Sequence, residues 1–198
     1  MLTVIPALLS IFQLYYFVYL TIWNSVAIAV VINYVFLVHS QTKIDSLTGL
    51  GNRIAYNDHI AILGRKSNVV LAVINIDLDE FKSINDTYGH HEGDQVLKVF
   101  ARQLENVFEE NGVSIRLGGD EFMVLVYENQ REILEKHIKT LNHNIKEYNE
   151  TSNLPYGIKF SYGMAILDHT YHSVQELIQH SDKLMYEAKK KILKESSC

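Results

Sequence analysis

The chain has 198 residues, a net charge of −5 and a pI near 6.0, a balance that excludes a generally basic surface for nucleic acid. Its length is enough for one domain with a short appendage. The single cysteine, Cys198, excludes an intramolecular disulfide framework and a cysteine-rich zinc module, and it suits a reducing compartment.

The charge is unevenly distributed, because residues 1–42 contain no Asp, Glu, Lys or Arg. Within them, residues 11–38 are apolar apart from a few polar side chains, and a helix of about 20 apolar residues crosses the hydrocarbon core of a bilayer. We therefore expect residues 1–42 to form a membrane segment, either one long tilted helix or two spans that meet near residues 23–25. A buried core helix is the alternative.

Basic residues follow this segment closely, at Lys43 and Arg53. We expect the segment to lie in the inner (cytoplasmic) membrane, and the positive-inside rule then predicts that the remaining chain lies on its cytoplasmic side. Residues 43–198 are long enough to form one compact domain of helices and strands.

Hydrophobic periodicity and turn residues predict the elements of this second domain. In chain order they are a helix over 52–63 ended by Gly64, a strand over 69–77 buried on both faces, a helix over 81–88, a break at 89–93, a helix over 94–110, a hairpin of strands 113–117 and 122–127, a helix over 131–148, a strand over 158–166 and a helix over 174–193. From the first strand onward the order is β-α-α-β-β-α-β-α. It predicts an α+β fold of palm or ferredoxin-like βαββαβ type, with a mostly antiparallel sheet and flanking helices on one face.

Acidic residues stand at two strand ends of this predicted sheet. Asp77 ends the first strand, while Asp120 and Glu121 follow Gly118 and Gly119 in the hairpin turn. If the hairpin lies beside the first strand, Asp77 and Asp120 meet at one edge, and paired carboxylates with nucleotide phosphates are the usual ligands of Mg²⁺. The glycines lack a Cβ, so a substrate can approach the backbone. An ordinary glycine-rich hairpin with solvated acids is the competing interpretation.

The sequence RLGGDEF at residues 116–122 resembles the signature of GGDEF-domain diguanylate cyclases. Further blocks resemble the motifs of the same family, in the same order and at similar spacing. They are DSLTGLGNR at 45–53, IDLDEFKSIND at 76–86 with GHHEGD at 89–94, FSYGMA at 160–165, and the helix segment 182–189. The resemblance extends over about residues 43–191 and is specific, since several separate blocks agree.

The resemblance implies a reaction in which two GTP molecules become cyclic di-GMP and two pyrophosphates. Each domain holds one GTP, so a homodimer is implied, and the 3′-hydroxyl of one GTP attacks the α-phosphate of the other. Such a transfer depends on in-line positioning and charge neutralisation, for which two Mg²⁺ ions per active site are implied, with Mn²⁺ as a substitute. A nucleic acid polymer is not expected as a partner.

The same resemblance implies roles for the acidic residues. Asp77 and Asp120 match the metal-binding carboxylates, and the carbonyl of Leu78 matches a backbone ligand. Glu121 matches a second acid that binds metal or assists deprotonation of the hydroxyl. Arg116 is expected to order the hairpin or to contact the partner's substrate, and Asp45 is expected to pair with Arg53.

The substrate-binding roles fall on Asn85 and Asp94 as guanine readers, on Lys82 and Lys189 as phosphate contacts, and on the backbone of Gly118 and Gly119. An aspartate can accept hydrogen bonds from guanine N1–H and N2–H, while an amide reads the O6 and N7 edge. Each side chain also has a structural alternative. The lysines can be solvated helix residues, Asn85 a turn residue, and Asp94 the N-cap of the following helix.

Two departures from the family pattern bear on function. Residues 109–112 read EENG where product-inhibited members carry R-x-x-D, so we expect no primary inhibitory site of that type. Ile192 and Leu193 stand where many members have Gly-Arg, so one phosphate-binding arginine is absent while the metal-site residues are intact. The alternatives to a cyclase are a degenerate GTP-binding signalling module that acts through a partner, and another nucleotidyl cyclase on the same scaffold.

Overall fold

The structure is a computed structural model that describes residues 4–39, 42–63 and 71–195, and it divides into the units Met1–Thr42 and Lys43–Cys198. The first unit contains one continuous helix, α1 (Val4–His39), without a break at residues 23–25. Within α1, Leu8–Val35 is long and apolar enough to cross a membrane. Of the two arrangements expected for this segment, the single long helix is therefore the one observed.

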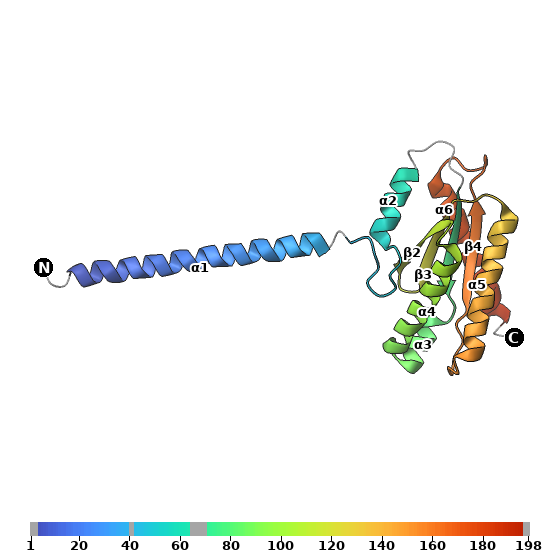
Figure 1. The fold of residues 1–198 in the computed structure, drawn as a ribbon, viewed down its shortest axis with the longest axis horizontal. Coiled ribbons are helices and arrows are strands. Elements are labelled where there is room, and N and C mark those ends of the chain that lie inside the picture. The colour runs from blue at the N-terminus through green and yellow to red at the C-terminus, as the bar shows by residue number, and fades with distance from the viewer. Residues whose placement is uncertain (1–3, 40–41, 64–70, 196–198) are drawn as a thin grey trace. The chain divides into compact units, whose positions relative to one another are not determined.

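The second unit is a four-stranded sheet with five helices around it (Figure 1). The helices are α2 (Arg53–Leu63), α3 (Phe81–Tyr88), α4 (His90–Phe108), α5 (Arg131–Thr151) and α6 (Val174–Glu195), and the strands are β1 (Ala72–Leu78), β2 (Gly112–Gly118), β3 (Glu121–Val126) and β4 (Phe160–Ile166). The strand order is β2-β3-β1-β4, and each pair of neighbours is antiparallel. This is the order of two interleaved split βαβ units, which confirms the predicted α+β, ferredoxin-like class.

Both faces of the sheet are covered by helices, and the prediction of helices on one face is therefore wrong. Successive residues of β1 point to opposite faces. Ile74 and Ile76 belong to a core built with α4 and α5, whereas Val73 belongs to a second core with Leu63 of α2 and Leu177 of α6. Every residue of β1 is buried, and its apolar side chains lie on both faces, so it needs cover on both sides; an uncovered face would leave apolar side chains in water.

Glycine explains the largest boundary difference. The predicted helix over 94–110 begins instead at His90, because Gly89 takes a φ of 89° between α3 and α4 and α4 starts directly after it. Gly93, expected to lie in a break, is a buried residue inside α4. A Cβ at this glycine would lie 2.0 Å from Oδ1 of Asn85, so its hydrogen lets α3 and α4 approach closely.

The other helix and strand boundaries differ less from the predicted ones. β4 begins at Phe160, and not at Ile158, because the side chain of Asn149 takes up both backbone groups of Ile158 in hydrogen bonds of 2.8 Å. Residues 69 and 70 of the first predicted strand, and Gly64, lie outside the described residues.

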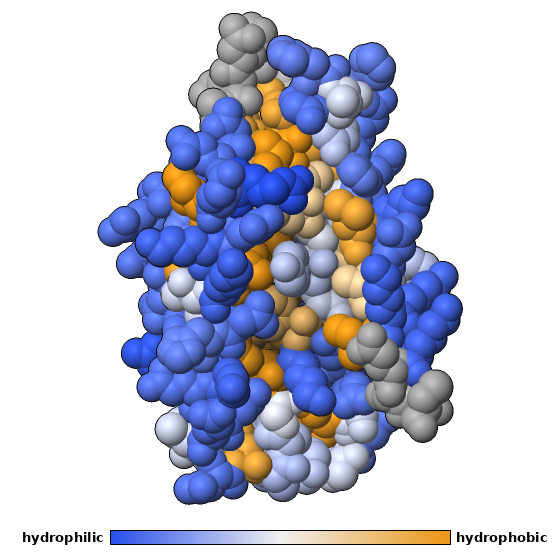
Figure 2. Space-filling model, turned by 90° about the vertical axis from the view of Figure 1, so that its right-hand side faces the viewer, coloured by the Kyte–Doolittle hydropathy of each residue, from blue (hydrophilic) through white to orange (hydrophobic). Residues whose placement is uncertain are grey.

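Helix α6 lies very close to the sheet at Gly163 of β4. A Cβ there would stand 2.0 Å from the carbonyl oxygen of Ser181 and 2.3 Å from the backbone nitrogen of Met185, so only glycine permits this approach. Beside the contact, Tyr162 and Met164 of β4 line a pocket between α5 and α6, and Figure 2 shows a hydrophobic strip between hydrophilic surfaces on this side of the molecule. The close approach determines which residues of α6 reach the end of β1.

Candidate active site

The sheet register brings the acid at the end of β1 to the hairpin acids. Asp77 lies directly opposite Glu121 of β3, and the N–H of Leu78 donates to the carbonyl oxygen of Asp120 at 3.2 Å. Side chains of directly opposed residues in an antiparallel pair project from the same face, with Cβ atoms about 4.5–5.5 Å apart. The structure thus brings Asp77, Asp120 and Glu121 together, as expected from the sequence.

Helix α6 adds a cation to this group. Nζ of Lys189 donates a hydrogen bond to Oδ1 of Asp77, and the side chains are 31% and 11% exposed respectively. The helix is fixed on β1 by Asn75, whose Nδ2 donates to Oγ of Ser181 at 2.8 Å. Asn75 and Asp77 lie on the same face of β1, so both connect the strand to α6.

Burial and neighbouring carboxylates raise the pKa of Asp120 and of Glu121. Burial is the largest cause of a raised pKa at Asp120, and the charge of Asp77 adds to it. At Glu121 burial is again first, followed by the charges of Asp77, Asp120 and Asp182. Such a concentration of carboxylates disfavours ionisation and is relieved by a bound cation.

The donor set fits a divalent cation that is shared with a nucleotide. In the described part of the chain, no three or more His, Cys, Asp or Glu side chains are arranged to hold a metal ion by themselves. Mg²⁺ is usually held by one or two carboxylates, with phosphate and water oxygens completing its shell. Asp77, Asp120 and the carbonyl of Leu78 would meet that requirement if phosphate oxygens completed the shell.

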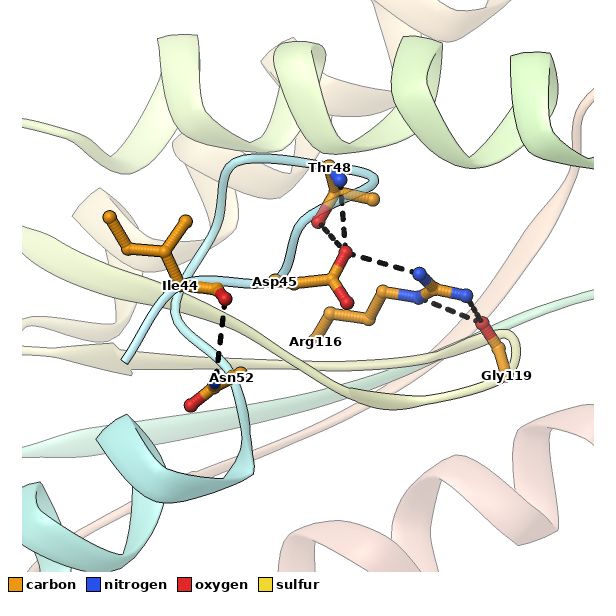
Figure 3. A network of polar contacts seen from close by, with 6 residues as sticks. All are labelled: Ile44, Asp45, Thr48, Asn52, Arg116 and Gly119. Atoms are coloured by element: carbon orange, nitrogen blue, oxygen red, sulfur yellow. Dashed lines mark hydrogen bonds and ion pairs between the residues drawn. The ribbon is translucent and has the colours of Figure 1, made fainter. Parts of the chain in front are cut away.

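A polar network holds the hairpin (Figure 3). Nε and Nη2 of Arg116 donate to the carbonyl oxygen of Gly119 at 3.0 and 2.8 Å, and Nη1 donates to Oδ1 of Asp45 at 3.1 Å. The same carboxylate oxygen accepts from the backbone and hydroxyl of Thr48 at 2.9 and 2.7 Å. Arg116 therefore orders the hairpin, the first of its two expected roles.

The expected pair of Asp45 with Arg53 is wrong. Arg53 is an exposed residue at the start of α2, and Asp45 pairs with Arg116. The reason is a parallel bridge between Gly51 and Ile115, which lays the turn that contains Asp45 against β2. A contact between residues so far apart in sequence leaves no signal in local spacing.

The two expected guanine readers lie on neighbouring helices. Asn85 is on α3 and Asp94 is on α4, next to Gly93, and both side chains are half-buried. Among the residues that the structure describes, neither side chain has a hydrogen-bond partner, so both are available to a ligand. The alternative of Asp94 as an N-cap is wrong, because α4 begins at His90.

The two expected phosphate lysines differ in their surroundings. Lys189 forms an ion pair with Asp77, whereas Lys82 is exposed on α3 and forms no ion pair within the described residues. One residue missed by the sequence analysis is Asp182, whose charge helps to raise the pKa of Glu121. Residues 182 and 189 are two helical turns apart on α6 and therefore share one face of the helix. This spacing could have indicated that Asp182 lies near the site.

Comparison with known proteins shows the family of the second unit. The family model described as "Diguanylate cyclase, GGDEF domain" matches residues 42–194. The chain is 33% identical over 156 residues to diguanylate cyclase DgcS of Shewanella oneidensis, covering 75% of this chain and 50% of that protein. It is 33% identical over 155 residues to cyclic di-GMP phosphodiesterase NbdA of Pseudomonas aeruginosa, but covers only 19% of that protein and 75% of this chain.

A protein of Staphylococcus saprophyticus described as an uncharacterized membrane protein is 29% identical over 181 residues, covering 86% of this chain and 50% of that one. Among solved structures, the GGDEF domain of TpbB (YfiN) from Pseudomonas aeruginosa has a TM-score of 0.67 at 29% identity, covering 75% of this chain and 89% of that domain. The chain thus spans at most half the length of these curated relatives.

Replacing Asp45 by Asn tests the hairpin network. Burial would raise the pKa of Asp45, but hydrogen bonds from Thr48 and Arg116 outweigh it and hold that pKa below the ordinary value of 3.8. The ionised form therefore stabilises the fold above that value, and this stabilisation is lost as the pH falls through the lowered pKa. We expect Asp45→Asn to lower the free energy of unfolding by about 1–2 kcal/mol at pH 7.

Denaturation monitored by circular dichroism from pH 7 to pH 3 measures this effect. The difference between wild type and Asp45→Asn should shrink toward the acid end. Asp58→Asn is the matched control, because Asp58 forms only an exposed pair with Lys43. An equal loss in both variants, or a loss independent of pH, would contradict the proposed role of the network.

Replacing Asp120 by Asn should have the opposite effect. A carboxyl whose pKa is raised by folding destabilises the fold once it ionises, and this penalty is absent at a pH below its ordinary value of 3.8. Without metal at pH 7, we expect Asp120→Asn to raise the melting temperature by about 1–3 °C. Millimolar Mg²⁺ should stabilise the wild type more than the variant, and a lower melting temperature for the variant without metal would refute the assignment.

Proposed function

The chain belongs to the GGDEF diguanylate cyclase family, and we propose that it condenses two GTP molecules into cyclic di-GMP with release of two pyrophosphates. The observation that carries the proposal is the register of β1 and β3, which joins Asp77 to the acids of the glycine hairpin. A merely structural hairpin would not need three carboxylates at one edge with Lys189 against them.

In this proposal some residues supply or neutralise charge, and others accept a proton or bind the phosphates. Asp77, Asp120 and the carbonyl of Leu78 would hold divalent cations, which neutralise phosphate charge and activate the attacking 3′-hydroxyl when bound. Glu121 would accept the proton of that hydroxyl, and its pKa, raised by burial and by the neighbouring carboxylates, supports this role because it makes the group a stronger base than an ordinary glutamate. Lys189 contributes a positive charge for the phosphates of GTP.

Base selection belongs to the α3–α4 pair. The carboxylate of Asp94 can accept from N1–H and N2–H of guanine, and the amide of Asn85 can donate to O6 or N7. Adenine presents an acceptor at N1 and lacks the 2-amino group, so the carboxylate of Asp94 would find no donor there, whereas an amide can turn to pair with either purine; Asp94 therefore carries most of the selection. The backbone of Gly118 and Gly119, at φ values of 148° and 53°, leaves the hairpin open to a phosphate.

The reaction requires two GTP molecules face to face, and we propose a homodimer in which each copy holds one of them. We propose in addition that α1 anchors the chain in the inner membrane, with the catalytic unit in the cytoplasm. The apolar span Leu8–Val35 supports the anchor, and so does the similarity to a staphylococcal protein described as a membrane protein.

A second candidate function is a GTP-binding module that signals through a partner without turnover. The specific observation in its favour is the sequence Ile192-Leu193, which leaves the site without the arginine of the family pattern. Similarity to NbdA, which is named a phosphodiesterase, is compatible with this candidate, because a domain of this family also occurs within a protein of another named activity.

Incubation of the full chain in detergent with GTP and Mg²⁺ separates the candidates. We expect cyclic di-GMP and pyrophosphate in a ratio of 1:2, measured by chromatography and a coupled pyrophosphate assay. Asp120→Asn should reduce the rate at least about 100-fold, since it removes charge from the metal site. Asp58→Asn, the same change at an exposed pair, should retain activity. GTP binding without product would favour the signalling module, and faster conversion of ATP would favour another nucleotidyl cyclase.

Replacing Gly93 by Ala tests the guanine pair without touching a polar side chain. A Cβ at this position would collide with Oδ1 of Asn85, which must rotate away, while alanine favours a helix by about 1 kcal/mol over glycine. We therefore expect unchanged or slightly higher thermal stability and about tenfold weaker GTP binding, measured by calorimetry.

Asn85→Ala should cause a similar loss of affinity, and the double variant should lose little more, because both changes remove the same contact. Wild-type affinity in Gly93→Ala, or fully additive losses in the double variant, would show that Asn85 does not read the base.

A further inference from the structure

Lys189 occupies the position in which a cation is needed before any metal ion binds. Its Nζ donates directly to Oδ1 of Asp77, whose side chain is only 11% exposed. A carboxylate this buried is costly without a partner of opposite charge. Within the described residues, Lys189 is the cation that contacts Asp77.

The backbone of Lys189 is fixed by the packing of α6, whereas its side chain is long and flexible. Asn75 and Gly163 fix α6 against the sheet, as described above, so the position of its backbone is set by packing. The lysine side chain itself is 31% exposed and has four rotatable bonds in its stem. It can therefore change partner without movement of the helix.

The contact is specific to Lys189 among the three consecutive lysines 189–191. Nζ of Lys190 lies 4.3 Å from the ring centroid of Tyr186, directed elsewhere on the helix surface. The placement of Lys189 on Asp77 is therefore not a general consequence of a basic run near an acidic site. Lys190 also provides a control with the same charge on the same helix.

We propose that Lys189 is an internal counter-ion that occupies Asp77 until a divalent cation displaces it, and that the displaced ammonium then contacts the phosphates of the nucleotide. This inference rests on the proposed function, because it needs Asp77 to be a metal ligand. An ammonium group and a divalent cation cannot share Oδ1 of Asp77 without strong repulsion, so metal binding and the Lys189–Asp77 pair compete. Lys189 is thus a positioning residue that couples metal binding to nucleotide binding.

The competition predicts a change in metal affinity that structural damage would not cause. Mn²⁺ is titrated into the full chain in detergent without nucleotide, and free Mn²⁺ is measured by electron paramagnetic resonance. Lys189→Gln should bind Mn²⁺ about threefold to tenfold more tightly than the wild type, because the competing charge is absent. Lys190→Gln should change the affinity less than about twofold.

A second measurement tests the transfer to phosphate. Addition of GDP should tighten Mn²⁺ binding to the wild type, in part because its phosphates draw Lys189 away from Asp77. In Lys189→Gln this gain should be smaller. Equal or weaker Mn²⁺ binding by Lys189→Gln without nucleotide would overturn the proposal, as would an undiminished effect of GDP in that variant.

Asp77→Asn separates failure of this inference from failure of the proposed function. Loss of the tight Mn²⁺ site in Asp77→Asn, with unchanged affinity in Lys189→Gln, would keep the metal site and reject the competition. Unchanged Mn²⁺ binding in Asp77→Asn would reject Asp77 as a metal ligand, and with it both proposals. Circular dichroism melts of all variants show whether each one is folded.

Discussion

The antiparallel register between β1 and β3 is the constraint on which the site depends. It sets Asp77 opposite Glu121 and joins Leu78 to the backbone of Asp120. A slip of one residue would turn every side chain of β1 to the other face. Ile74 and Ile76 prevent the slip, because it would take them out of the α4–α5 core and put Asp77 in their place. The apolar residues of the strand therefore determine where its carboxylate points.

Two glycines then decide how closely the helices bring their polar residues to the sheet and to one another. Gly163 allows α6 to lie almost against the backbone of β4, which carries Lys189 to the end of β1. Gly93 allows α3 to lie against α4, which sets Asn85 against the residue that precedes Asp94. Neither glycine has a positive φ, so the reason for each is space and not backbone conformation.

The sequence was sufficient for features that repeat along the chain. Alternation and apolar runs predicted the strands and the hairpin, and the acids at the strand ends then fell at one edge. It was insufficient where a residue typical of helix breaks is needed for close packing of two helices, and where two interacting residues are far apart in the chain. Gly93 indicates a break by composition, yet it lies inside α4, where the side chain of Asn85 leaves no room for a Cβ. Asp45 offers no local sign of Arg116, since the bridge from Gly51 to Ile115 brings them together.

The carboxylates that the strands and the hairpin bring together require positive charge nearby. Burial, together with the charge of Asp77, raises the pKa of Asp120 and Glu121, so positive charge nearby stabilises their ionised forms. In the chain alone that charge comes from Lys189 at Asp77 and from Arg116, which acts on Asp120 while it is bonded to the carbonyl of Gly119 and to Asp45. A rigid arginine on the hairpin and a mobile lysine on the helix are suited to different tasks. The arginine holds the turn through its bonds to Gly119 and Asp45, whereas the lysine, as we propose, leaves its carboxylate when a divalent cation binds there.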